Sequence, residues 1–153
     1  MAKKKDSDKR VRAWVVFLAT HTMLLERIEA ALSKAKLPPL TWYDVLWELD
    51  KAESHRLRMH DLAERVILTR FNLTRLADRL EKLHLIKRER SAEDRRGAYC
   101  VITPAGLQLR KKMWPVYRQQ LEELFTSHLS QEEAETMIRI MERMRPATRK
   151  TGG

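Results

Sequence analysis

The apolar residues of this chain change their period between residues 59 and 102, and this change constrains the fold more than any other feature. Up to Leu83 they recur three and four residues apart, as in helices, and after it come two short runs that suit strands. The sequence predicts a helix over 59–66, a turn at Ile67-Leu68, a second helix capped by Thr69, and strands over 85–90 and 98–102. This order is a helix-turn-helix followed by a β-hairpin, a wing.

The second of these helices has one apolar face and one polar face. Its apolar face consists of Leu73, Leu76, Ala77, Leu80 and Leu83. At about 100° per residue, the opposite face consists of Phe71, Arg75, Asp78 and Lys82, with Thr74 and Arg79 beside them. A short helix with basic residues on its outer face is typical of a helix that reads DNA in the major groove.

Long helical segments flank this central part. The first runs over residues 9–35, with an apolar seam at Val11, Trp14, Leu18, His21, Leu25, Ile28 and Leu32. After Pro38-Pro39, Thr41 with Asp44 resembles a capping box and predicts a helix over 42–51. Since the first helix has apolar residues off its seam as well, we expect it to pack against two surfaces, one of them a partner subunit.

The C-terminal part predicts two more helices. Thr103 caps the first, which starts with a proline, is kinked by Pro115 and runs to about Leu129. Ser130 and Glu133 form a capping box for the last helix, which ends at Pro146. The expected fold class is therefore mainly α with a small β-hairpin wing: a winged helix-turn-helix flanked by N- and C-terminal dimerisation helices.

The charge distribution indicates a polyanionic partner. The net charge is +10, and residues 55–98 carry twelve Lys and Arg against seven Asp and Glu. The four glycines cannot form a phosphate-binding loop, and no catalytic or metal-binding motif is present, so we expect no enzyme activity, no cofactor and no metal. A single cysteine, no signal peptide and no apolar run of membrane-spanning length predict a cytoplasmic protein without a membrane partner.

Several runs together resemble the MarR family of bacterial regulators. They are Leu62–Arg65, Leu73–Glu81, Leu85–Arg88, Glu93–Gly97 and Ile102–Gly106. The resemblance covers residues 10–145 and implies a homodimer and transcriptional repression through an inverted-repeat operator. It also implies release by a small, often aromatic ligand. The family usually has glycine where His84 stands, and histidine tolerates the left-handed backbone that this turn needs.

The expected domain organisation follows this resemblance. Residues 1–8 are predicted as a disordered basic arm, 9–146 as a single MarR-like domain and 147–153 as a flexible tail. Within the domain, 9–35 and 103–146 are dimerisation helices, and 41–102 is the DNA-binding head.

The predicted DNA-binding residues lie in two groups. The helix supplies Arg70, Phe71, Asn72, Thr74, Arg75 and Arg79, and the wing supplies Asp94, Arg95 and Arg96. Arginine matches guanine edges and phosphates, and Arg96 suits a narrow minor groove. Phe71 either touches a thymine methyl or packs inside the turn, and Arg95 either contacts phosphate or is an ordinary surface residue. The resemblance gives Asp94 the role of holding Arg96 or the wing turn.

A small-molecule site is predicted from aromatic residues. Trp14, Phe17, Trp42, Tyr43 and Trp47 either line an effector pocket between the dimer base and the head or form ordinary core. A planar aromatic acid is the expected ligand. Cys100, on a predicted strand, is expected to be a buried residue rather than a redox sensor, and no two histidines show ligand spacing.

Two other binding functions compete with DNA recognition. A winged helix used for protein contacts would not need basic residues on its second helix, and an RNA binder would need an aromatic stacking platform that is not visible. The sequence therefore favours a DNA-binding transcriptional regulator.

Overall fold

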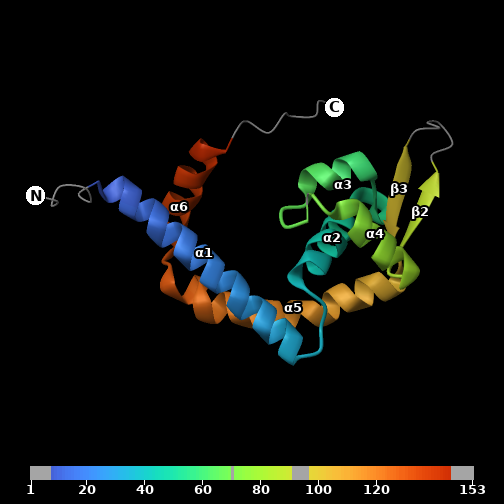
Figure 1. Cartoon of the computed structure of the whole chain (residues 1–153), viewed down its shortest axis with the longest axis horizontal. Helices are drawn as coiled ribbons and strands as arrows, with labels where there is room; N and C mark the ends of the chain where they lie inside the picture. The colour runs from blue at the N-terminus through green and yellow to red at the C-terminus, as the bar shows by residue number, and fades with distance from the viewer. Residues whose placement is uncertain (1–7, 70, 91–96, 146–153) are drawn as a thin grey trace, which may run out of the picture.

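The computed structural model of the chain describes residues 8–69, 71–90 and 97–145 (Figure 1). Its elements in chain order are α1 (Lys9–Lys34), α2 (Leu40–Lys51), η1 (Glu53–His55), β1 (Arg56–Arg58), α3 (Met59–Arg65), α4 (Leu73–Lys82), β2 (Ile86–Arg90), β3 (Ala98–Ile102), α5 (Pro104–Leu124), η2 (Thr126–His128) and α6 (Gln131–Met144). The winged helix-turn-helix and the mainly helical fold class predicted from the sequence are confirmed. Residues 91–96 of the predicted wing loop lie outside the described residues.

A head is formed by α2, α3 and α4, which pack on a three-stranded antiparallel sheet of order β1-β3-β2. Its core is built from the apolar faces of the three helices and one face of the sheet. Val45, Leu46, Leu62, Leu80 and Cys100 are fully buried there. The core of the head is thus closed by the chain's own helices and sheet.

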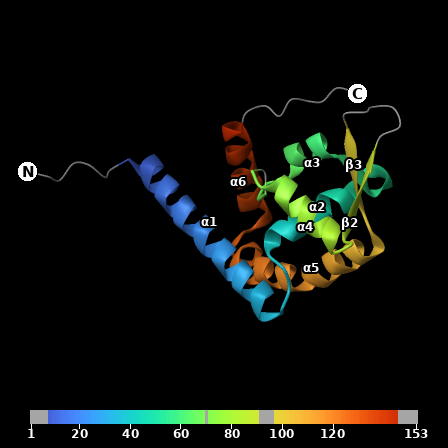
Figure 2. The same ribbon diagram turned by 45° about the vertical axis from the view of Figure 1, so that its right-hand side comes forward.

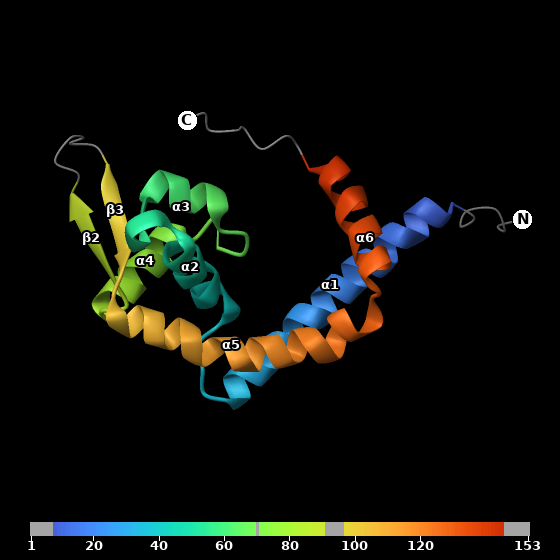
Figure 3. The ribbon, with the colours of Figure 1, turned by 180° about the vertical axis from the view of Figure 1, so that it is seen from behind.

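Helix α5 joins this head to a base, which is formed by α1, α6 and the C-terminal part of α5, as the view from behind shows (Figure 3). A second, smaller core lies where α1, α2 and α5 meet, and its buried residues are Ile28, Leu32, Leu40, Tyr43 and Met113. Helix α2 contributes to both cores, because Leu40 and Tyr43 face the junction while Val45 and Leu46 face the head.

The outer part of the base is different. The N-terminal half of α1 projects away from the head (Figure 2), and α6 has no buried residue. Large apolar side chains on both helices are exposed, namely Val11, Trp14, Val15, Val16, Phe17, Leu18, Met23, Ile138, Ile140 and Met144. None of the described helices is long and apolar enough to cross a membrane.

Local chemistry fixes several helix ends as predicted. Thr103 accepts a hydrogen bond from the N–H of Gly106, and Ser130 forms a complete capping box with Glu133. Asp8, which the sequence placed in the disordered arm, instead caps α1 by accepting from the N–H of Arg10. The rest of the predicted arm, residues 1–7, and the predicted tail lie outside the described residues.

The end of α4 has the left-handed turn that was expected at His84. His84 has φ of 57°, and the N–H groups of His84 and Leu85 donate to the carbonyls of Glu81 and Leu80. This pattern is a Schellman motif, which normally favours glycine at the left-handed position. Gly106 packs against the same turn, and a Cβ there would lie 2.2 Å from the carbonyl oxygen of Leu85. Only glycine fits without a backbone shift.

Three sequence predictions about helix ends are wrong. Helix α2 begins at Leu40 with Pro39 as N-cap, so Thr41 does not cap it. The Leu40 N–H donates instead to the Glu29 carboxylate of α1 at 2.9 Å, and a tertiary contact replaces the local cap.

Thr69 does not cap α4, because its side chain is buried and the helix starts after Asn72. Helix α5 ends at Leu124 rather than near Leu129, since Phe125 leaves the helical region with φ of −132°.

Candidate nucleic-acid interface

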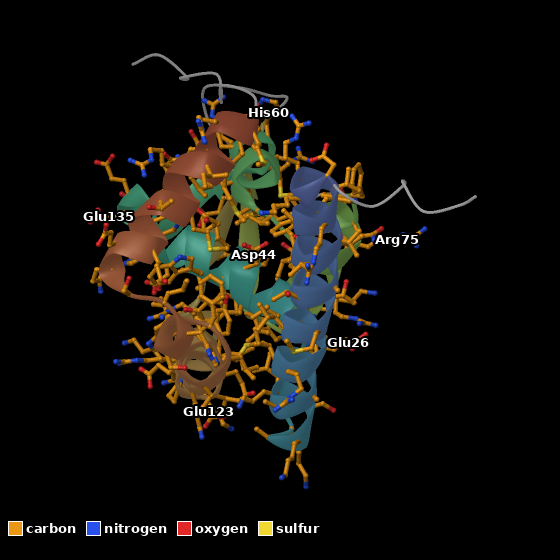
Figure 4. The ribbon with its side chains drawn as sticks, turned by 90° about the vertical axis from the view of Figure 1, so that its left-hand side faces the viewer. Glu26, Asp44, His60, Arg75, Glu123 and Glu135 are labelled. Carbon is orange, nitrogen blue, oxygen red and sulfur yellow. The ribbon has the colours of Figure 1, made fainter. Side chains whose placement is uncertain are left out.

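The outer face of α4 is open to solvent. Phe71, Asn72, Thr74, Arg75 and Arg79 are all exposed, as the sequence placed them. Arg75 points away from the body of the molecule (Figure 4). The buried residues of the helix, Leu73, Ala77 and Leu80, hold it to the head from the other side. Burial of one face therefore presents the basic face to whatever approaches the head.

The acidic residues of α4 are engaged by the wing. The Arg88 guanidinium of β2 is bound to the Asp78 carboxylate, and the Arg88 N–H donates to Glu81 at 2.9 Å. Asp78 raises the pKa of Arg88 above its ordinary value. Within the described ranges, Arg75 and Arg79 have no acidic partner within 4 Å. The unneutralised charge of this face is therefore positive.

Phe71 stands at the start of this face and is 97% exposed. The alternative that it packs inside the turn is wrong. It borders a cleft of about 500 Å³ between α2 and α4. The cleft is lined by Pro39, Thr41, Trp42, Leu68, Thr69, Phe71, Asn72, Arg75, Leu76 and Arg79.

Four predicted DNA-binding residues lie outside the described residues. They are Arg70, Asp94, Arg95 and Arg96. Their assignments, including the link between Asp94 and Arg96, remain predictions.

A second cavity, of about 620 Å³, lies between α2 and α5 and reaches the turn before α4. Its aromatic wall consists of Tyr43, Trp47, Trp114 and Tyr117. The Tyr43 ring is stacked on Trp47 at 6.2 Å and on Trp114 at 6.1 Å, and it meets Tyr117 edge-on at 5.2 Å between ring centroids. Burial raises the pKa of the Tyr43 and Tyr117 phenols.

Two charged pairs lie beside the Trp47 ring at this cavity. The guanidinium of Arg110 lies 2.6 Å from the Asp50 carboxylate and 5.3 Å from the centre of the Trp47 ring. On the same ring, the Lys51 ammonium lies at 5.5 Å and binds Glu48 at 2.8 Å. A guanidinium has further N–H groups that could bind a carboxylate of a ligand.

The structure does not bring the five predicted aromatic residues together. Tyr43 and Trp47 line the cavity, whereas Trp42 lines the cleft beside α4. Trp14 and Phe17 pack on one another, 6.2 Å apart, on the exposed half of α1. Sequence reasoning missed the cavity residues Arg110, Trp114 and Tyr117. The available signal was the three-residue spacing of Trp114 and Tyr117, which places both rings on one face of α5.

Cys100 is fully buried, as predicted. Burial raises the pKa of its thiol to about 11, so the thiolate is scarce at neutral pH. In the part of the chain that is described, no three His, Cys, Asp or Glu side chains are grouped to hold a metal ion.

A basic helix exposed beside a β-hairpin defines this chain as a winged helix-turn-helix protein. The sequence model of the MarR family matches residues 37–97. Over these residues, which include α2, α3 and α4, the chain is therefore similar to the MarR family.

One relative is the HTH-type transcriptional regulator PrsX of Escherichia coli. It is 34% identical over 93 residues, which are 61% of this chain and 55% of PrsX. The chain thus spans about half the length of the first relatives it matches.

Solved structures match along the whole fold. AbsC of Streptomyces coelicolor, a MarR family transcriptional regulator, has a TM-score of 0.83 and 26% identity, covering 93% of this chain and 95% of AbsC. Sco3205 from the same organism, solved in complex with DNA, has a TM-score of 0.84 and 22% identity, covering 96% and 95%. BpsR of Bordetella bronchiseptica, whose DNA binding is regulated by 6-hydroxynicotinic acid, has a TM-score of 0.73 and 19% identity, covering 87% and 92%.

Proposed function

We propose that this protein is a DNA-binding transcriptional regulator that acts as a repressor. The observation that carries the proposal is the outer face of α4, where Arg75 and Arg79 are exposed and have no acidic partner among the described residues. Asp78, the acid on that face, is bound to Arg88. Two relatives with the same fold, Sco3205 and the MarR protein of Escherichia coli, have been solved with DNA.

The proposed DNA-bound form is a homodimer. The exposed apolar residues of α1 and α6 support it, because contiguous apolar surface of this kind is unusual on a soluble monomer. Two heads related by a two-fold axis would place their α4 helices in successive major grooves, about 34–36 Å apart. The operator would then be an inverted repeat. In this proposal Arg70 and the wing residues Asp94, Arg95 and Arg96 complete the contacts.

We further propose that a planar aromatic acid in the cavity between α2 and α5 releases the protein from DNA. The stacked rings of Tyr43, Trp47 and Trp114 suit a planar ligand, and Arg110 suits its carboxylate. The regulation of BpsR by 6-hydroxynicotinic acid gives the probe.

Selection from a random duplex pool would test DNA recognition. Arg75→Ala should weaken binding to the selected duplex by about 1–3 kcal/mol if Arg75 touches a base, and discrimination against random DNA should fall. Lys112→Ala, the same charge change on the exposed side of α5, is the matched control and should have little effect. Affinity should fall steeply with salt, with a slope of about −0.9 per phosphate neutralised. A salt-independent affinity would refute DNA binding by this face.

Tryptophan fluorescence would test the ligand site. Titration with 6-hydroxynicotinic acid should quench the emission and release the duplex. Quenching should be lost in the double variant Trp47→Phe/Trp114→Phe, which removes both tryptophans of the cavity. It should be kept in Trp14→Phe/Trp42→Phe, because the two tryptophans replaced there lie outside the cavity. Release of DNA with quenching that survives in the first variant would place the ligand elsewhere.

A further inference from the structure

We propose that Phe71 recognises pyrimidine methyl groups, so that the protein binds DNA more tightly where thymine or 5-methylcytosine meets this ring. This assignment rests on the proposed function and extends it, because it makes cytosine methylation a chemical signal that the protein can detect. It starts from a side chain whose chemistry differs from that of its neighbours on the DNA-binding face.

Phe71 is a large apolar side chain on a face that is otherwise polar and basic. It is 97% exposed, more than any other large apolar residue in the described part of the chain. The other exposed side chains of this face are Asn72, Thr74, Arg75 and Arg79. A phenyl ring in this position is unfavourably hydrated, and it gains free energy when an apolar group covers it.

The chain is anchored to the head on both sides of Phe71. Before it, the N–H groups of Ile67 and Leu68 donate to the Asp44 carboxylate of α2, each at 2.8 Å. After it, Leu73 is buried in the core of the head. The exposed ring is therefore carried by a segment that is attached to the head at both ends.

Phe71 lies beside the charged residues that are proposed to bind DNA. It borders the same cleft as Asn72, Arg75 and Arg79, and it precedes the first residue of α4 by two positions. The N-terminal residues of a DNA-reading helix contact base edges. A helix fits the major groove, about 12 Å wide, but not the minor groove, about 6 Å wide. The ring would therefore meet the major-groove edge of a base.

The major-groove edges of the bases offer one apolar group that matches this ring. They present hydrogen-bond donors and acceptors, together with the methyl group at C5 of thymine, and phenylalanine is among the side chains that pack on this methyl group. A cytosine methylated at C5 carries the same group at the same edge. Because the phenyl ring has no polar atom, it responds to the methyl group and not to the hydrogen-bonding pattern of the base.

The test compares duplexes that differ by single methyl groups. In the duplex selected above, each thymine is replaced in turn by deoxyuridine, which removes the methyl group and keeps the pairing edge. At a thymine where this weakens binding, the T·A pair is then replaced by C·G, with and without a methyl group at C5 of the cytosine. Wild type, Phe71→Ala and Phe71→Leu are titrated at low salt, where phosphate contacts keep weak variants measurable. Ile67→Ala is the matched control, because Ile67 is also exposed but lines the cavity between α2 and α5.

In the wild type, deoxyuridine at one thymine of each half-site should weaken binding about fourfold per site, the equivalent of burying one methyl group. Methylation of the cytosine that replaces this thymine should strengthen binding by about the same factor. Both effects should be absent in Phe71→Ala and unchanged in Ile67→Ala. Phe71→Leu should keep most of both effects, because its side chain is still apolar.

A wild type whose affinity is the same after every exchange of thymine for deoxyuridine would overturn this assignment while leaving DNA binding by α4 intact. A methyl effect that survives in Phe71→Ala would also overturn it, because the ring would then contact sugar, phosphate or another protein chain. Failure of the wild type to select any duplex would overturn the proposed function itself, and this assignment with it.

Discussion

The head and the outer base of this molecule differ in the burial of the apolar faces of their helices. In the head, Leu46, Leu49, Leu62 and Leu80 are fully buried by the chain's own helices and sheet. In the base, apolar residues of α1 and α6 recur with the same helical spacing but remain exposed. The comparison teaches that a regular apolar seam predicts burial without saying which chain provides the covering surface.

Breaking the proposed covering surface should have the largest effect. Leu18→Asp places a charge among the exposed apolar residues of α1, and a carboxylate cannot be buried there without a partner. We expect the protein to change from a dimer to a monomer at micromolar concentration, measured by sedimentation. Lys34→Asp, on the polar surface of the same helix, should leave the dimer intact. A Leu18→Asp protein that remains dimeric would show that α1 is covered in another way.

The next largest effect is expected when a large apolar side chain is truncated in the core of the head and, for comparison, in the base. Leu46→Ala in the head should lower the free energy of unfolding by about 3–5 kcal/mol, because it leaves a cavity in a closed core. Ile138→Ala in α6, where the side chain is 56% exposed, should cost less than about 1 kcal/mol when measured in the Leu18→Asp background. Urea unfolding measures both. Equal losses would mean that α6 is packed as tightly as the head.

The burial of Cys100 makes the stability of the head depend on pH. Burial raises the thiol pKa to about 11 in the folded state, whereas an unfolded chain ionises it near 8.5. The raised pKa contributes stability that is complete below about pH 8.5 and is lost as pH rises toward 11. We expect a loss of about 3 kcal/mol over that window, at 1.36 kcal/mol per pKa unit.

Urea unfolding at pH 8 and pH 10.5 checks this loss. In Cys100→Ala, the free energy of unfolding should not show this loss between the two pH values. An identical pH dependence in both proteins would assign the effect to other groups.

The smallest effect is expected at the turn after α4. His84 holds a left-handed backbone with φ of 57°, and a residue with a Cβ is strained there by about 1 kcal/mol relative to glycine. His84→Gly should therefore raise the free energy of unfolding by about 0.5–1 kcal/mol, seen as a higher urea midpoint. His84→Ala should not raise it. Stabilisation by both substitutions would mean that the imidazole, rather than the backbone, is the source of strain.

Much of the fold was predictable because local signals and tertiary structure agree. The change of period at Leu83, the proline after Thr103 and the capping box at Ser130 all predicted element ends that the structure confirms. Thr41 and Thr69 look equally suitable as caps by sequence. They failed because Glu29 of α1 satisfies the start of α2 and because the Thr69 side chain is buried.

The DNA-binding face was more predictable than the cavity. The exposed positions of α4 follow from one helix and its period, so Arg75 and Arg79 could be placed without knowledge of the other helices. The cavity is made by α2 and α5, which are more than fifty residues apart in sequence. No local pattern indicates that Trp114 and Tyr117 would meet Tyr43 there.

The sequence by itself determined the winged helix-turn-helix, because helical and strand periods, caps and turn residues act over a few neighbours. The tertiary structure alone decided which aromatic residues share the cavity, and it gave Asp44 to the turn at Ile67 and Leu68. It also left the apolar seam of α1 half exposed. These outcomes depend on distances between segments far apart in the chain, and the packing of α2 against α1, α3 and α5 sets those distances.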